Sequence, residues 1–162
     1  MFVKRVDKDY SDHTCVESVI NYIFSDNGNA GVYIGGLNVL DPLNAADEFN
    51  MVKRFYKKTD GVQLRHYVIS PEPRDWFIPY MCSELAYLIC AYYADRFQAV
   101  FSVHTNTRFT HIHIVLNTVS FADGLKLHEG LGEMKQFEAY CHKCYARIKA
   151  KYGYVRKELG SF

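Results

Sequence analysis

The sequence predicts a single α+β domain over residues 1–162, with a central, mainly antiparallel β-sheet flanked by helices. The chain has 162 residues, of which 49% are hydrophobic, as expected for one domain with a sizeable core. In the first half, segments with strand-like apolar patterns alternate with segments of helical periodicity. In the second half, short turn-forming spacers join neighbouring strands, which is typical of antiparallel hairpins.

The first half is expected to alternate strands with helices. Its elements are, in order, a strand over 2–6, a helix over 11–24, a strand over 31–34, a helix over 43–58 and a strand over 62–70. Asp26–Asn29 is a turn signal before the second strand, and Gly35-Gly36 follows that strand. Pro71 and Pro73 end the third strand, because proline cannot donate to a strand ladder.

The second half is expected to contain hairpins between two helices. Its elements are, in order, a helix over 75–95, strands over 98–104 and 110–120, a short strand over 125–127 and a helix over 131–152. The spacer 105–109 suits one hairpin, and Asp123-Gly124 signals another. We expect the last helix to stop near Gly153.

Composition limits the function classes. The formal net charge of +1 argues against a protein that grips duplex DNA by bulk electrostatics, although a local basic groove remains compatible with it. The five scattered cysteines imply no disulfide scaffold and favour a reducing compartment. The N-terminus lacks an apolar signal core, and no window has the roughly 18 apolar residues of a membrane span. We therefore expect a soluble, cytoplasmic protein with no membrane segment.

Three histidines form the most informative pattern. His111 and His113 are two residues apart in an apolar run, so both imidazoles project from one face of a strand. His104 ends the preceding apolar run and completes the set if that run is the neighbouring strand. Three imidazoles that converge from a rigid sheet make a divalent-metal site with open positions for substrate. A reading in which these histidines are ordinary core residues stays open.

Other polar residues near the histidines have two readings each. Small polar side chains at Thr105–Thr107 and Thr110 suit hydrogen bonds to the imidazoles. Asn117 ends the strand, on the side opposite His111 and His113 if alternation holds, or turned toward the site by a kink. The sequence leaves open whether His66, on the strand expected over 62–70, lines the same cleft. The CxxC pair at 141 and 144 lies on one helix face and fits buried small side chains better than zinc ligands.

With these residues in hand, the chain resembles the relaxases, or mobilisation nucleases, of the MOB-P-like class in the HUH endonuclease superfamily. Their pattern H-x-D-x4-H-x-H-x3-N is matched from His104 to Asn117, except that Asn106 stands at the acidic position. The segment 65–70 resembles the strand ending in serine of the second family motif, and 19–23 resembles the first motif, which holds the nucleophilic tyrosine. Segment 119–126 resembles the hairpin after the metal strand. Relaxases normally carry long C-terminal regions, so the resemblance implies the N-terminal part of a longer protein.

The resemblance implies a function and roles for individual residues. It implies nicking of single-stranded DNA at an origin of transfer through a 5′-phosphotyrosyl intermediate, in plasmid or integrative-element mobilisation in bacteria, with accessory mobilisation proteins as further partners. Tyr22 would be the nucleophile, with Tyr10 and Tyr33 as competitors, and Asn106 would take the place of the catalytic acid. The cofactor would be a divalent metal, Mn, Mg or Zn, on His104, His111 and His113. Residues expected to contact DNA are Ser70, His66, Asn117, Lys53 and Arg54.

Two other functions are compatible with the same residues. A metal-dependent phosphoesterase would use the three histidines without a tyrosyl intermediate, and it would hydrolyse substrate without trapping DNA. A catalytically weak, single-stranded DNA-binding module would bind DNA without holding a metal. Adduct formation and metal binding distinguish these functions from the first.

Overall fold

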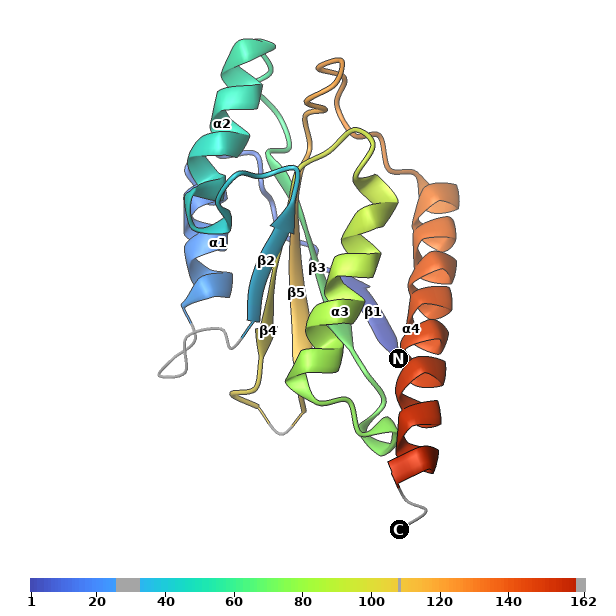
Figure 1. Ribbon diagram of the computed structural model, residues 1–162. Helices are drawn as coiled ribbons and strands as arrows, with labels where there is room; N and C mark the ends of the chain where they lie inside the picture. Colours follow the sequence, from blue (N-terminus) through green and yellow to red (C-terminus); the bar gives the residue numbers. More distant parts are fainter. Residues whose placement is uncertain (26–32, 108, 160–162) are drawn as a thin grey trace.

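The computed structural model describes residues 1–25, 33–107 and 109–159, which form a five-stranded sheet between two layers of helices (Figure 1). Every pair of neighbouring strands is antiparallel, which confirms the predicted fold class. In sheet order the strands are β1 (Phe2–Arg5), β3 (Leu64–Ser70), β5 (His111–Asn117), β4 (Ala99–His104) and β2 (Tyr33–Leu37).

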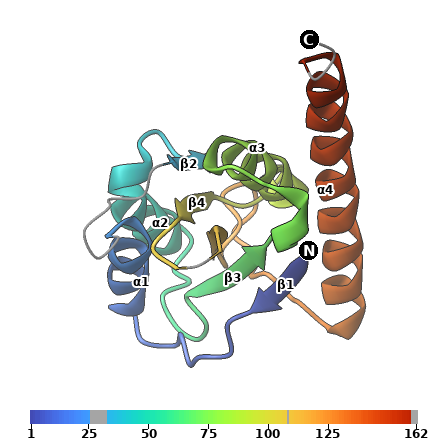
Figure 2. The same ribbon diagram turned by 90° about the horizontal axis from the view of Figure 1, so that it is seen from below.

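Helices cover both faces of the sheet. One face is covered by α1 (Cys15–Phe24) and α2 (Ala45–Phe55), and the other by α3 (Pro79–Cys90) and α4 (Leu131–Leu159), as the two views in Figures 1 and 2 agree. Short 3-10 turns occupy Pro42–Asn44, Pro73–Asp75 and Ala91–Tyr93. No helix in these described parts of the chain is long and apolar enough to cross a membrane.

Alternation along β5 divides its side chains between two cores. Ile112, Ile114 and Leu116 pack into the larger cluster under α3 and α4, whereas Val115 packs into the smaller cluster under α1 and α2. His111 and His113 have the same parity as Val115, so their imidazoles face the α1 and α2 side. The sequence of β5 therefore places one buried apolar face against α3 and one partly polar face against α1.

Several predicted helix boundaries were wrong. The helix expected over 11–24 begins at Cys15, and the helix expected to end at 95 ends at Cys90. The helix expected over 75–95 begins only at Pro79, because Trp76 adopts a left-handed backbone with φ of 54° and proline is well suited to a first helical turn. The last helix does not stop near Gly153 but continues to Leu159. A glycine within a helix costs only about 1 kcal/mol, which is too little to end a long helix.

Two expected strands also differ. The strand expected at 31–34 lies at Tyr33–Leu37 and includes the two glycines, which were expected to follow it. A side chain at Gly35 would meet the ring of Phe101 at 2.4 Å, so the close packing requires glycine there. The strand expected at 125–127 is only an isolated bridge between Val119 and Lys126. The turn signal Asp26–Asn29 lies outside the described residues.

Candidate metal centre

The three histidines converge at one end of the sheet. The register of β4 against β5 pairs His104 with His111 and Ser102 with His113, so all three imidazoles rise from adjacent positions on one face. The ring centroids are 5.4 Å apart for His104 and His111, 4.4 Å for His104 and His113, and 5.0 Å for His111 and His113. One nitrogen of each ring lies within 4.8 Å of the others. The predicted convergence is therefore present.

Backbone carbonyls orient two of the imidazoles. Nε2 of His104 donates to the carbonyl oxygen of Ile23 in α1 at 2.6 Å, so the lone pair of this ring resides on Nδ1. Nδ1 of His111 lies 3.2 Å from the carbonyl oxygen of Phe109. A hydrogen bond at one ring nitrogen fixes which nitrogen binds a metal, and this is the usual second shell of a metal-ligating histidine.

His113 is oriented by another imidazole. Its Nδ1 lies 2.8 Å from Nε2 of His66, and Nδ1 of His66 lies 3.3 Å from the hydroxyl of Tyr10. When Nδ1 of His113 donates to His66, its Nε2 carries the lone pair, and His66 in turn donates to Tyr10. His66 therefore lines the site through its contact with His113, one of the three candidate metal-ligating histidines. At 4% exposure it is too buried for the DNA contact expected of it.

Burial keeps these two imidazoles neutral. It lowers the pKa of His66 to about 4, and it is also the main cause of the lowered pKa of His113, to which the neighbouring imidazoles contribute. A neutral imidazole retains the lone pair that a metal requires, so His113 can bind a cation at neutral pH without first losing a proton, and His66 can accept the hydrogen bond from its Nδ1.

Among the described residues, two buried polar atoms at the site have no hydrogen-bond partner. They are Nε2 of His113 and the hydroxyl oxygen of Ser102, which belong to residues paired in the β4–β5 register. Buried polar atoms are nearly always paired, so an orphaned imidazole nitrogen among two other imidazoles indicates a ligand position. Three imidazole nitrogen donors suit a divalent transition metal with open coordination positions. His104, His111 and His113 therefore fit the expected cofactor.

Tyr22 lies against this cluster. Its ring is 57% exposed and contacts His113 edge-on, with centroids 5.8 Å apart. It precedes Ile23, whose carbonyl holds His104, so one turn of α1 carries the tyrosine and orients a ligand. Of the competitors, Tyr10 is 6% exposed and directed at His66, and Tyr33 packs on the other face of the sheet, beside Tyr80 of α3. Tyr22 is the one of these three that reaches the histidines while staying accessible.

The cleft beside the centre contains one expected DNA contact. Ser70 is half-buried and lines a cleft of about 430 Å³ together with Phe2, Thr107, Phe109 and His111. Sequence reasoning did not select the two phenylalanines, which are 61% and 45% exposed. Their exposure beside a strand end depends on tertiary packing, for which the sequence carries no local signal.

Asn106, which was predicted to act in catalysis, and Arg54 and Lys53, which were predicted to contact DNA, lie outside the group of three histidines. Asn106 is exposed in the turn between β4 and β5. The hydrogen bonds described for the three histidines run to Ile23, Thr107, Phe109 and His66. Arg54 is exposed on α2. Lys53, one position earlier, is only 2% exposed, because it continues the buried stripe of Ala45 and Phe49, so it is not the surface DNA contact expected of it.

The expectation for Asn117 was wrong. Asn117 lies on the same face of β5 as His111 and His113, since positions four and six apart share a face, and it is fully buried at the other end of the strand. Its amide nitrogen donates to the side-chain oxygen of Gln98 at 2.9 Å and to the carbonyl of Phe49 at 3.3 Å. It therefore fastens α2 to the sheet and has no access to DNA.

Comparisons with known proteins agree with this geometry. The family model "Relaxase: MobA/VirD2-like, nuclease domain" matches residues 22–154. A solved structure described as "Molecular Basis of Vancomycin Resistance Transfer in Staphylococcus aureus" is similar in fold, with a TM-score of 0.70 and 11% sequence identity. The similarity covers 94% of this chain and 93% of that chain. No curated protein matched the chain significantly.

Proposed function

Since the chain belongs to the MobA/VirD2-like relaxases, we propose that it nicks single-stranded DNA at an origin of transfer through a covalent bond to Tyr22. Membership in this nuclease family makes it a DNA-nicking enzyme of mobilisation. The nucleophile, the use of a divalent metal and the residues in contact with DNA are the parts we propose. The observation that carries the proposal is the exposed ring of Tyr22 against His113, within the three-histidine cluster.

The proposed reaction is a transesterification. The Tyr22 oxygen bonds to phosphorus as the phenol loses its proton, and the bond from phosphorus to the 3′-oxygen breaks. That oxygen takes up a proton and leaves as a 3′-hydroxyl, while the 5′-phosphate stays on the tyrosine. Because one phosphodiester replaces another, the strand can be closed again by the reverse step.

The chain's own residues supply position and polarity. His104, His111 and His113 would hold the divalent cation, Mn, Mg or Zn, which when bound neutralises charge on the phosphate oxygens. The hydrogen bond from His104 to Ile23 couples the ligand set to the helical turn of Tyr22, so attacking group and charged centre move as one unit. Asn106 lies in the turn beside this centre, where its amide is available to hydrogen-bond substrate.

The neighbouring cleft supports a single-stranded substrate. Exposed rings at Phe2 and Phe109 line it with Ser70, and unpaired bases stack on such rings with little dependence on sequence. Ser70 offers a hydroxyl for a phosphate oxygen, and Arg54 adds an exposed positive charge elsewhere on the same side of the sheet. Accessory mobilisation proteins would contribute the remaining specificity for the origin.

Covalent capture of DNA tests the nucleophile. The chain is incubated with Mn²⁺ and a labelled oligonucleotide that carries the origin of the element encoding it, and adducts are resolved on denaturing gels. Tyr22→Phe should abolish the adduct. Tyr87→Phe is the matched control, because Tyr87 is 55% exposed on the opposite helical layer, and it should leave capture unchanged. An adduct that survives in Tyr22→Phe shows that another residue is the nucleophile.

A phosphoesterase without a tyrosyl intermediate is the second candidate, because the three histidines alone suffice for metal-assisted hydrolysis. In that case Tyr22→Phe would retain cleavage, and the wild-type protein would yield product with no adduct. The same gel distinguishes the two reactions.

A further inference from the structure

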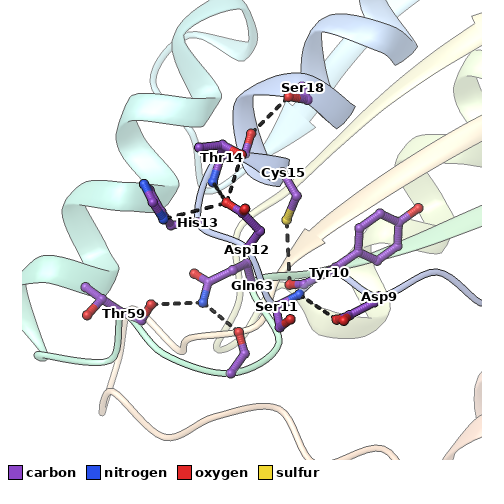
Figure 3. Close-up of polar contacts among 11 residues, drawn as sticks. Asp9, Tyr10, Ser11, Asp12, His13, Thr14, Cys15, Ser18, Thr59 and Gln63 are labelled. Atoms are coloured by element: carbon purple, nitrogen blue, oxygen red, sulfur yellow. Dashed lines mark hydrogen bonds and ion pairs between the residues drawn. The ribbon is translucent and has the colours of Figure 1, made fainter.

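A second polar pocket lies at the opposite end of α1 from Tyr22. It has a volume of about 340 Å³ and is lined by His13, Asn50, Lys53, Arg54, Thr59 and Gln63. Figure 3 shows its wall around His13, Thr59 and Gln63, beside α2. At a rise of 1.5 Å per residue, the start of α1 at Cys15 lies about 12 Å along the helix from Ile23. The pocket is therefore separate from the histidine centre.

Lys53 is the unusual member of this lining. Its side chain is 2% exposed, and its Nζ lies 5.5 Å from the centre of the Phe49 ring, with no hydrogen-bond partner among the residues that the structure describes. An unpaired buried ammonium is costly, so a lysine in such a place either loses its proton or is matched by an anion. Burial is the main cause of a lowered pKa of Lys53, to about 7, and nearby Lys126 lowers it further.

The remaining lining groups favour an anion. His13 and Arg54 add cationic or donor groups, Asn50 and Thr59 add polar donors, and the described lining includes no carboxylate. The nearest acid on α1's approach, Asp12, already accepts from the Thr14 backbone and hydroxyl at 2.8 Å each, and it lies 3.6 Å from His13 (Figure 3). No acid is thus left to pair with Lys53 from within the lining.

The wall opposite α2 is already fixed. The side-chain nitrogen of Gln63 donates to the carbonyls of Thr59 at 3.0 Å and Gly61 at 2.6 Å, which ties the loop before β3 (Figure 3). Lys126 closes this loop from outside through a hydrogen bond from its Nζ to the carbonyl of Asp60. The pocket is consequently held open by contacts that do not involve Lys53.

We propose that this pocket is a phosphate-binding site, in which Lys53 supplies a buried charge and Arg54 and His13 close on the anion from the rim. The phosphate is carried either by a DNA backbone or by a free anion, since both present the same tetrahedral oxygens. None of the residues that line this pocket belongs to the metal centre, so phosphate binding can be tested separately from nicking.

Calorimetric titration of the EDTA-treated protein with inorganic phosphate, at constant ionic strength in chloride, tests the site. The wild-type protein should bind one phosphate, and Lys53→Met should weaken binding at least tenfold. Lys58→Met is the matched control, because Lys58 is an exposed lysine nearby that does not line the pocket, and it should bind within twofold of wild type. Absence of binding in the wild type, or equal binding by Lys53→Met, overturns the proposal.

Further variants keep the test decisive. If Lys53→Met fails to fold, Arg54→Met is used, because it alters only an exposed rim residue. It should weaken phosphate binding at least threefold. Unchanged phosphate affinity overturns the proposal. His113→Asn should bind phosphate as the wild type does, so loss of nicking and loss of this site are separable. Displacement of phosphate by a ten-residue thymidine oligonucleotide assigns the site to DNA, and binding without displacement assigns it to a free anion.

Discussion

The two faces of the sheet treat buried polar groups in opposite ways. On the face under α3 and α4, the side chain of Glu129 is 1% exposed, and its carboxylate has hydrogen-bond and ion-pair partners. It accepts hydrogen bonds from the hydroxyls of Tyr67 and Tyr93 and lies 3.3 Å from the side-chain nitrogens of Arg5 and Arg65. This buried charge has its partners within the fold, and it joins the loop before α4 to three strands or turns.

On the face under α1 and α2, buried polar atoms lack partners. Within the described residues these are Nε2 of His113, the hydroxyl of Ser102 and Nζ of Lys53. A satisfied network such as that of Glu129 stabilises the fold, whereas an unsatisfied one costs free energy that a ligand recovers. The other described buried side-chain atoms without a hydrogen bond, Nε of Arg65 and Nε of Arg96, belong to guanidinium groups that lie in ion pairs with Glu129 and Asp123. Both proposed binding sites therefore lie on the face whose buried polar groups have no partner within the fold.

Removing a metal ligand should have the largest effect and should spare stability. His113→Asn keeps a side-chain amide near the position of Nδ1, for the contact with His66, but removes Nε2. We expect single-turnover nicking to fall about a thousandfold, as when a group that stabilises transition-state charge is lost. Urea unfolding in EDTA should change by less than about 1 kcal/mol. Full nicking by this variant would contradict the assignment of the ligand.

Removing the charge of Glu129 should do the reverse. Glu129→Gln leaves Arg65 without its counter-charge and Arg5 with Asp7 alone, so the free energy of unfolding should fall by about 3 kcal/mol. Metal affinity of the folded protein should stay within twofold of wild type. Glu138→Gln, at an exposed position on α4, is the control and should have no effect on either quantity. A weakened metal site in Glu129→Gln would show that the two faces are coupled.

His66 should have an intermediate effect on the metal centre. His66→Phe removes the acceptor for Nδ1 of His113, and loss of such an outer partner typically lowers metal affinity 10- to 100-fold. Nitrogen NMR of the metal-free protein should show the His113 ring shift from the Nδ1–H tautomer to a mixture. His66→Gln, which retains an acceptor oxygen, should restore part of the metal affinity and part of the Nδ1–H tautomer of His113. An unchanged tautomer in His66→Phe would remove His66 from this role.

Sequence patterns with a fixed period predicted the fold and the histidines well. The spacing of His111 and His113 alone places them on one face, and the hairpin spacer places His104 opposite, which the β4–β5 register confirms. Asn117 shows that the same rule must be applied with care, because even spacing puts it on the histidine face and burial at the far strand end then removes it from the site.

Other parts of the site depend on long-range packing. The pairing of β3 with β5 brings His66 to His113 across 47 positions of sequence, and no local pattern encodes that register. Lys53 was expected to contact DNA, although its spacing from Phe49 and Ala45 places it on the buried stripe of α2. A charged residue at a core-facing helical position was the signal that was missed.

The smallest effect concerns the pH dependence of stability through Lys53. Its folded pKa of about 7 lies below the ordinary 10.5, so between these values the unfolded chain holds a proton that the folded protein lacks. The free energy of unfolding therefore rises with pH in this window, because burial of Lys53 destabilises the fold fully below about pH 7 and this penalty disappears as pH rises toward 10.5.

The charged and titratable groups around Lys53 are Cys15 on α1, Lys126 in the loop after β5, and His13 and Arg54 at the rim of the pocket. Burial raises the pKa of the Cys15 thiol to about 11, so it stays neutral below pH 9. In phosphate-free buffer, Lys53→Met should exceed wild type in stability at pH 7.5. One proton corresponds to about 1.4 kcal/mol per pH unit, so this advantage should shrink by about 1 kcal/mol by pH 8.5. Urea unfolding at both pH values measures it, with Lys58→Met expected to parallel wild type. Parallel curves for Lys53→Met and wild type would mean that Lys53 keeps its proton in the fold, which requires an anionic partner already in place.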